Sequence, residues 1–446
     1  MASCVCSSTA MAEKISWNCA LFVALMLVLS ICESSTSDDE FNLQIQNMLQ
    51  ENDFSNNNNV INKVCDEIYV VREGETLQTI SEKCGDPYIV EENPHIHDPD
   101  DVFPGLVIKI NPFMLHHIGL EAEASRHVKY DSKELFVFGD SYVDTGNTNK
   151  NKPGSWKDPY GITFPQKPAG RFSDGRVLTD FIAKYLGIRS PIPYKFRKIV
   201  PKHYLKYGMN FAYGGTGVFD TLSSGPNVTA QIDSLKQLIQ DNVYTVQDLT
   251  NSIAYVSVAG NDYNFYLATN GSLPGFPSFI ASLVKQITTD LINLQTLGFK
   301  KIVVGGLQPL GCLPQTTAPT SFQRCNSTFN NLVALHNNLL NQSVTKLNQQ
   351  FKDHTTFAIL DIFDSFVSVL NHTSNHKNIK ERLKPCCFGV SSKYNCGSVD
   401  ENNVKKYLVC ENPESNFFWD LLHPTQAGWN AVYDELKMKG LHQIFY

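Results

Sequence analysis

Outside its N-terminal segment, the chain of 446 residues has no apolar run long enough to cross a bilayer. It has no basic stripe interleaved with aromatic residues, which argues against nucleic-acid binding. The G-x-x-x-x-G-K pattern of a phosphate-binding loop is also missing, and we expect no cofactor. Charged residues are scarce at 18%, whereas apolar residues reach 42%, so we expect a packed protein rather than a disordered one.

The N-terminal segment predicts a signal peptide over residues 1–34. Lys14 precedes an apolar run at 20–31, and small and polar residues follow. The run suits a cleavable signal and is short for a membrane span, although a signal anchor is the alternative. We therefore expect a secreted protein, either extracellular or in the cell wall. Five glycosylation sequons would fit this location, at Asn227, Asn270, Asn326, Asn341 and Asn371.

The twelve cysteines agree with export. Four fall within the predicted signal, and eight follow it: Cys65, Cys84, Cys312, Cys325, Cys386, Cys387, Cys396 and Cys410. Their even number is what disulfides in an oxidising compartment require. Cys65 with Cys84 and Cys312 with Cys325 are plausible pairs, and the last four cysteines allow three connectivities. Zinc binding is the rival interpretation, but the adjacent cysteines give poor ligand spacing.

Charge divides the rest of the chain into units. Residues 35–112 hold 16 acidic and 4 basic side chains, whereas residues 113–446 hold 26 acidic and 32 basic side chains. Such a split is typical of separately built parts, although both can also be ordinary solvated surfaces. We expect a polar linker at 35–64, a small domain at 65–112, a connector at 113–131 and a larger domain at 132–446. The connector ends in GLEAEASRH, which is similar to the end of a second signal peptide and suggests two secreted proteins joined by fusion or by a gene-model error.

The residue pattern of the small domain predicts a β-α-α-β unit that is cross-linked by a disulfide. Its segments YVVREGETLQTIS, Asn93-Pro94 and FPGLVIKI resemble the LysM module. The resemblance implies binding of N-acetylglucosamine (GlcNAc) oligomers such as chitin, in a groove formed by two loops. The alternative is a module that keeps the fold without the affinity. His95 and His97 have no evident third partner, so we expect no metal. The candidate glycan-binding residues are Gly74, Glu75, Thr76, Leu77, Asn93 and Pro94.

The larger domain alternates short apolar segments with longer amphipathic ones. This alternation predicts an α/β fold with a parallel sheet covered by helices on both faces. In such sheets the active site gathers at the carboxyl ends of the strands. Strands are expected at 135–138, 253–258, 302–304 and 357–360, and helices at 177–186, 230–239, 279–297 and 331–351.

Three residues suggest nucleophilic catalysis. Ser141 directly follows the first strand, and Asp420 and His423 lie three apart before the last helix. A serine hydroxyl needs a neutral imidazole to take its proton, and the imidazole needs an acid to fix its tautomer. Taken singly, the serine would be a turn or cap residue and the histidine a surface residue. Together they predict a Ser-His-Asp triad.

Two other segments could stabilise an oxyanion. A glycine-rich loop at 210–217 can present a backbone N–H, and Asn261 follows the strand at 253–258 with a side-chain amide. Backbone and amide donors of this kind stabilise the tetrahedral intermediate of acyl transfer.

The segments that hold Ser141, the glycine-rich loop, Asn261 and the Asp420–His423 pair resemble the GDSL esterase/lipase family, also called SGNH hydrolases. The chain looks most like the plant extracellular branch of this family, through FVFGDSYVDTGNTN, PYGITFP, GRFSDGRVLTDFIA and LQPLGCLP. The resemblance implies a flavodoxin-like three-layer sandwich, unlike the α/β-hydrolases, whose G-x-S-x-G is absent at Ser141. The serine is followed by tyrosine rather than leucine. The implied roles are nucleophile for Ser141, base for His423, and partner of the base for Asp420. The implied oxyanion hole consists of Ser141, a glycine of the Gly214-Gly215 pair, preferably Gly214, and Asn261.

We therefore expect a secreted serine esterase or lipase that hydrolyses carboxylic esters of lipids or cell-wall components through an acyl-enzyme. One alternative is a GlcNAc-oligomer-binding protein with a weak or inactive hydrolase domain. Another is an extracellular acyltransferase. The expected partners are an ester substrate and, at the LysM-like domain, a chitin oligomer, with no nucleic acid and no stable membrane span.

Overall fold

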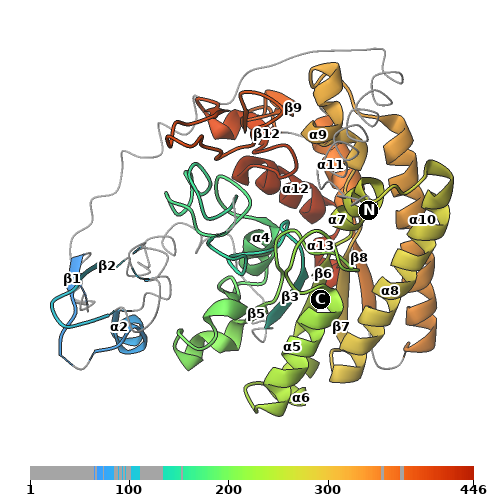
Figure 1. Ribbon diagram of the computed structural model, residues 1–446. Helices are drawn as coiled ribbons and strands as arrows, with labels where there is room; N and C mark the ends of the chain where they lie inside the picture. Colours follow the sequence, from blue (N-terminus) through green and yellow to red (C-terminus); the bar gives the residue numbers. More distant parts are fainter. Residues whose placement is uncertain are drawn as a thin grey trace, which may run out of the picture. The chain divides into compact units, whose positions relative to one another are not determined.

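The computed structural model describes residues 65, 68–73, 75–84, 89, 93, 96, 102–110, 134–151, 154–352, 356–371 and 376–445. The predicted signal peptide, linker and connector lie outside these residues, as do His95 and His97. The chain divides into two compact units, one built mainly before residue 131 and one mainly after it (Figure 1). Within the described ranges, no helix has both the length and the apolar character needed to span a membrane.

The small unit contains an antiparallel strand pair and a helix. β1 (Ile68–Val70) pairs with β2 (Val107–Lys109), with Tyr69 opposite Ile108, and α2 (Leu77–Cys84) lies between them in sequence. The helix buries Leu77 and Ile80 against the inner face of the strands. The predicted disulfide Cys65–Cys84 is present. The second predicted helix falls mostly on residues outside the described set.

The large unit is built on a six-stranded parallel sheet with the order β4-β5-β3-β6-β7-β8. All four predicted strands are present, and two short ones, β4 and β5, were not predicted. The strands are β3 (Leu135–Gly139), β4 (Ile192–Pro193), β5 (Gly208–Asn210), β6 (Ile253–Ser257), β7 (Lys301–Gly305) and β8 (Thr356–Leu360). Every residue of β3 is buried, as expected for a strand covered on both faces.

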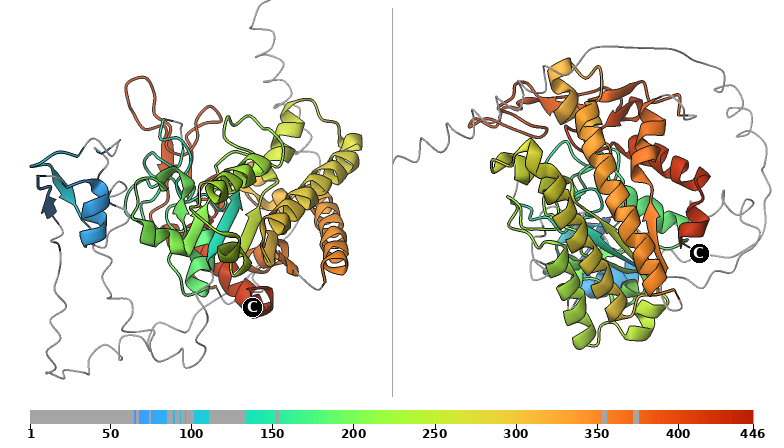
Figure 2. Two further views of the ribbon diagram at one scale, coloured as in Figure 1. Left: turned by 90° about the horizontal axis from the view of Figure 1, so that it is seen from below. Right: turned by 90° about the vertical axis from the view of Figure 1, so that its right-hand side faces the viewer.

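Helices cover both faces of this sheet (Figure 2). Leu135 and Val137 point into a core shared with α4 (Leu178–Tyr185), α11 (Ile362–Leu370), α12 (Gln426–Met438) and α13 (Leu441–Phe445). Phe136 points to the other face, where its ring packs edge-on against Phe299 and Tyr244. That face carries α5 (Val228–Gln240), α8 (Phe276–Leu297) and α10 (Ser327–Gln350). The predicted α/β three-layer sandwich is confirmed.

Shorter elements complete the large unit. They are η4 (Tyr194–Phe196), η5 (Lys202–Tyr207), α6 (Val246–Thr250), α7 (Gly260–Ala268), η6 (Leu273–Gly275), η7 (Leu310–Cys312), α9 (Pro314–Thr317), η8 (Ala318–Thr320) and η9 (Pro413–Ser415). Of these, α7 and η7 follow β6 and β7, so they lie at the carboxyl end of the sheet.

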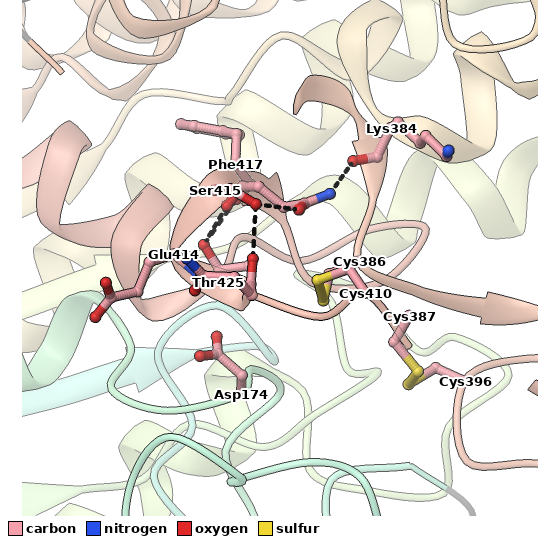
Figure 3. The surroundings of a disulfide bond; sticks show 12 residues. Asp174, Lys384, Cys386, Cys387, Cys396, Cys410, Glu414, Ser415, Phe417 and Thr425 are labelled. Carbon is pink, nitrogen blue, oxygen red and sulfur yellow. Dashed lines mark hydrogen bonds between the residues drawn. A yellow bond between two sulfur atoms is a disulfide. The ribbon is translucent and has the colours of Figure 1, made fainter. Parts of the chain in front are cut away.

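A segment with two disulfides precedes α12. β9 (Glu381–Pro385) pairs in parallel with β12 (Asn416–Phe418), and β10 (Cys387–Gly389) pairs with β11 (Tyr407–Val409). Figure 3 shows the two disulfides of this region side by side, Cys386–Cys410 and Cys387–Cys396. The structure thus selects one of the three connectivities left open, and Cys312–Cys325 forms as expected.

Candidate active site

Ser141 is presented at the carboxyl end of β3 by a close approach of two strands. Gly139 has a φ of +146°, and a Cβ placed on it would lie 1.9 Å from the carbonyl oxygen of Ser257 on β6. The Asp140 N–H donates to that same oxygen at 3.2 Å. Only glycine tolerates this contact and this backbone angle, so the chain can turn sharply and leave Ser141 facing the cleft.

Asp420 and His423 lie in a tight turn between β12 and α12. The carboxylate oxygen Oδ1 of Asp420 accepts the backbone N–H groups of Leu422 and His423, each at 2.8 Å. Nδ1 of His423 lies 2.9 Å from both carboxylate oxygens, and Nε2 lies 2.7 Å from Ser141 Oγ. Thr425 then caps α12 through the N–H of Gly428. The structure therefore brings together the three residues predicted as a triad.

The environment keeps Asp420 ionised. Burial alone raises the pKa of Asp420, but the His423 imidazole and the hydrogen bonds to the carboxylate outweigh it and lower the pKa below its usual range. A carboxylate in this state favours the tautomer of His423 that carries its proton on Nδ1 and leaves Nε2 free to accept from Ser141.

Tyr160 contacts the Asp420 carboxylate, a contact that the sequence did not predict. Its hydroxyl donates to Asp420 Oδ2 at 2.7 Å, and its ring is buried against Trp419 and Phe172. Burial, together with the charge of Asp420, raises the pKa of Tyr160 well above its ordinary value, so the hydroxyl stays protonated and remains a donor. Tyr160 lies in the PYGITFP block, but nothing local in that block indicates its partner.

Tyr142, the residue that replaces the leucine of the family pattern, braces the other side of the histidine. Its hydroxyl donates to the Leu422 carbonyl at 2.7 Å, and its ring packs against the imidazole of His423 with centroids 5.7 Å apart. The tyrosine thus fixes the backbone directly before His423. Asp140, on its other flank, accepts the N–H of Tyr142 at 3.0 Å.

Asp140 is a second buried carboxyl group beside the nucleophile. It is 6% exposed, and burial raises its pKa to about 7, against the lowering effects of the Tyr142 N–H and of His423. It lines the same cleft as Ser141, His423 and Asn261. Among the described residues, no three His, Cys, Asp or Glu side chains gather as a metal site would require.

Asn261 of α7 lines the cleft with Ser141 and His423. Its Nδ2 donates one hydrogen to the Thr216 carbonyl at 2.9 Å, and an amide nitrogen carries two hydrogens. Ala259, two residues before Asn261, has a φ of +116°, which is costly for a residue with a Cβ. Ala259 is the N-cap of α7 and lies two residues after the end of β6, so this turn sets where α7 begins.

The geometry argues against Gly214 in the oxyanion hole. Its N–H donates to Asp144 Oδ2 at 2.9 Å and to Thr148 Oγ1 at 3.1 Å, so it is already engaged. Gly215 follows with a φ of +83°, and its N–H has no hydrogen-bond partner among the residues that the structure describes. The N–H of Ser141 likewise has none there. Gly215 is therefore the better candidate of the pair.

In the small unit, the side chain of Glu75 is turned inward. Both of its carboxylate oxygens accept from the Tyr69 hydroxyl, and Oε1 pairs with Lys83 Nζ at 2.9 Å. Burial opposes the charge, but the hydrogen bonds from Lys83, the Arg72 N–H and Tyr69 lower the pKa of Glu75 to about 2. Both carboxylate oxygens of Glu75 are therefore engaged within the small unit.

The other candidate glycan residues differ in their availability. Asn93 is buried, and its side chain bonds the backbone of Ile89 and Lys109, which ties its loop to β2. Leu77 is buried in the core, whereas Thr76 is exposed and exchanges hydrogen bonds with Thr79. Two further candidates lie outside the described residues, Gly74 and Pro94.

Comparison with known proteins agrees with both resemblances. A family model described as GDSL-like lipase/acylhydrolase matches residues 135–436, and a LysM domain model matches residues 69–111. One GDSL esterase/lipase of Arabidopsis thaliana is 54% identical over 72% of this chain and 90% of its own length. A second from the same organism is 48% identical over 73% of this chain and 94% of its own length.

Among solved structures, a catalytic mutant of an acetylxylan esterase from Geobacillus stearothermophilus aligns with 70% of this chain and 96% of its own, at 13% identity and a TM-score of 0.33, which is too distant to support an inference. The sequence relatives and the match over 135–436 are decisive. The chain therefore belongs to the GDSL-like lipase/acylhydrolase family, and it is a carboxylic ester hydrolase.

Proposed function

We propose that the protein is a secreted serine esterase whose triad is Ser141, His423 and Asp420. The observation that carries this proposal is the continuous chain of contacts, 2.7 Å from Ser141 Oγ to His423 Nε2 and 2.9 Å from His423 Nδ1 to the Asp420 carboxylate. Both distances are within hydrogen-bond range and match the roles of nucleophile, base and orienting acid. Secretion is supported by the signal-like N-terminus and by four disulfides.

In the first step, His423 Nε2 takes the proton of Ser141 Oγ as the oxygen attacks the ester carbonyl carbon. The resulting oxyanion accepts hydrogen bonds from the Ser141 N–H, the Gly215 N–H and the Asn261 amide. When the intermediate collapses, the bond to the alcohol oxygen breaks, and the alcohol leaves with the proton from Nε2.

In the second step, water attacks the acyl carbon and gives one proton to His423 Nε2. The bond between the acyl carbon and Ser141 Oγ breaks, the proton returns to Oγ, and the carboxylic acid leaves. Asp420 stays ionised throughout and stabilises the imidazolium that forms twice in each cycle.

We further propose the domain boundaries expected from the sequence, with a LysM domain at 65–112 and a hydrolase domain at 132–446. The LysM match supports binding of a GlcNAc oligomer, which would hold the esterase on a glycan surface. With Glu75 and Asn93 engaged inside the domain, a sugar would contact the exposed Thr76 and backbone groups. Retention of the secreted protein on chitin beads, and its release by soluble chitin oligomers, tests this binding. Failure to be retained would leave a LysM fold without affinity.

The esterase proposal is tested by covalent labelling. An alkyl fluorophosphonate should react with Ser141 and with no other serine, since activation of the hydroxyl depends on His423. Mass spectrometry of the labelled peptides identifies the site, and His423→Ala should abolish labelling. Acyl transfer to glycerol or sugar acceptors, in preference to water, would instead favour an extracellular acyltransferase.

A further inference from the structure

The cleft at Ser141 encloses little space. The enclosed part of the cleft has a volume of about 20 Å³, and the rest is open to solvent. One water molecule needs roughly 10–15 Å³ by the same kind of measure. The acyl carbon is bonded to Ser141 Oγ in the acyl-enzyme, so the group attached to that carbon must fit here or leave the cleft. Besides Asp140, Ser141, His423 and the first two residues of α7, the cleft is lined by Tyr142, Asn264, Gln308, Leu310, Leu313 and Leu422.

One apolar wall is fixed in place. Leu310 and Leu313 flank Cys312, whose disulfide to Cys325 joins η7 to the start of α10. The backbone of Gly311 is bonded on both sides: its carbonyl accepts the Asn326 N–H at 2.7 Å, and its N–H donates to the Asn330 side chain at 2.9 Å. A cross-linked and hydrogen-bonded wall of this kind does not retreat to admit a larger group.

A second part of the lining is held in place as well. Tyr142 holds the Leu422 carbonyl through its hydroxyl, and it is only 7% exposed. The two parts are joined directly, because the Gln315 N–H of α9 donates to the Leu421 carbonyl at 2.9 Å. Hydrogen bonds between these two segments therefore hold this part of the lining together.

The rim of the cleft is polar. Asn264 is exposed and Gln308 is half-buried, and the side-chain amide of Gln315 lies 3.4 Å from Asn264 Oδ1. A methylene chain that passes over these amides would remove them from water without replacing their hydrogen bonds. Beyond the first few carbons, an acyl chain therefore gains little from this surface.

We propose that this site is specific for esters of short acyl groups, about two to four carbons long, with acetyl esters the best substrates. The inference concerns the acyl group alone and sets no limit on the size of the alcohol part. This inference rests on the proposed function, because it takes Ser141 as the residue that carries the acyl group, and it names the substrate class of that same site.

The test uses the full secreted protein and p-nitrophenyl esters of acetate, butyrate, hexanoate and octanoate at concentrations below micelle formation. The alcohol is constant, so differences in kcat/KM, divided by the uncatalysed rate of each ester, report on the acyl group. We expect acetate or butyrate to exceed octanoate by about tenfold or more, as one or two misplaced methylenes in a fixed pocket suffice for this ratio.

Two variants widen the pocket. Leu313→Ala should raise the octanoate-to-acetate ratio of kcat/KM by about tenfold. Leu310 is half-buried, and Leu310→Ala, which serves if the first variant folds poorly, should change the ratio in the same direction. Met438→Ala removes an apolar side chain that is 65% exposed on α12 and outside the cleft, so it should leave the ratio unchanged.

A wild-type preference for octanoate over acetate would overturn the inference, while Ser141-dependent turnover of octanoate would keep the proposed function. Equal rates across the series would overturn it too. Turnover that Ser141→Ala leaves intact would instead remove the proposed function, and the inference with it.

Discussion

The hydroxyl of Tyr160 donates to Asp420 Oδ2 at 2.7 Å, across 260 residues of sequence. The other carboxylate oxygen accepts backbone N–H groups from its own turn. Asp420 is thus held from two sides, one local and one distant. Its orientation depends on a segment that has no part in the reaction itself.

Tyr160→Phe removes this hydrogen bond while keeping the ring. We expect kcat to fall on the order of tenfold with little change in KM, since a hydrogen bond to a charged group contributes about 1.5–3 kcal/mol. Because the Tyr160 hydroxyl lowers the pKa of Asp420, its loss should move the acid limb of the pH–rate profile to higher pH. Tyr407→Phe, a tyrosine of the same buried cluster, is the matched control and should leave kcat and the profile unchanged.

Gly139→Ala tests the strand contact that presents the nucleophile. The new Cβ would lie 1.9 Å from the Ser257 carbonyl oxygen, so β3 and β6 must separate. We expect a loss of more than about 3 kcal/mol in the free energy of unfolding, or no folded protein. Gly187→Ala is the control: its φ is +69°, but a Cβ there meets no atom within 4 Å. It should cost about 1 kcal/mol, and similar costs for both variants would contradict the account.

Asn261→Ala should lower kcat by about 10²–10³ and leave KM within a few-fold. In the proposed oxyanion hole this amide donates to the oxyanion, a charge that the ground-state ester lacks. Steady-state kinetics on one soluble ester measure both constants. Asn430→Ala, on α12 and outside the cleft, should behave as wild type. An Asn261→Ala enzyme that loses affinity at an unchanged kcat would place the amide in substrate binding instead.

Asp140 makes stability depend on pH. Burial raises its pKa to about 7, from an ordinary value near 4, so the folded state holds a proton that the unfolded chain releases between these values. The contribution of Asp140 is therefore fully present below about pH 4 and is lost as pH rises through about 7. Asp140→Asn, which cannot ionise, should lose this dependence. Its stability relative to wild type should improve by about 1 kcal/mol or more from pH 4.5 to pH 8, measured by chemical denaturation; no change in the difference would contradict the shift.

Regular patterns explain what was predictable of the fold. The apolar strand at 135–138 and its three counterparts have enough residues to show that both faces are covered. β4 and β5 are short and contain proline, glycine and asparagine, which are depleted in strands, so only their pairing beside β3 identifies them. The connectivity of the last four cysteines was likewise set by how β9 to β12 pair, which no spacing reveals.

In the site, the proximity of Ser141, Asp420 and His423 was predictable because each lies in a compact block with its own chemistry. Gly214 was preferred for its place before a Gly-Thr step, and nothing in that step reveals that Asp144, 70 residues away, accepts its N–H. Tyr160 was missed for the same reason. Residues that act through a distant partner leave no local signal in a single sequence.

The proposed function depends on the triad. Its most direct test is hydrolysis of a p-nitrophenyl ester by the secreted protein beside Ser141→Ala. Deletion of a triad nucleophile typically lowers kcat on the order of 10⁶, so the variant should fall to background, while Ser282→Ala, an exposed serine of α8, keeps full activity. Equal turnover by wild type and Ser141→Ala, or no turnover by either, would contradict the account.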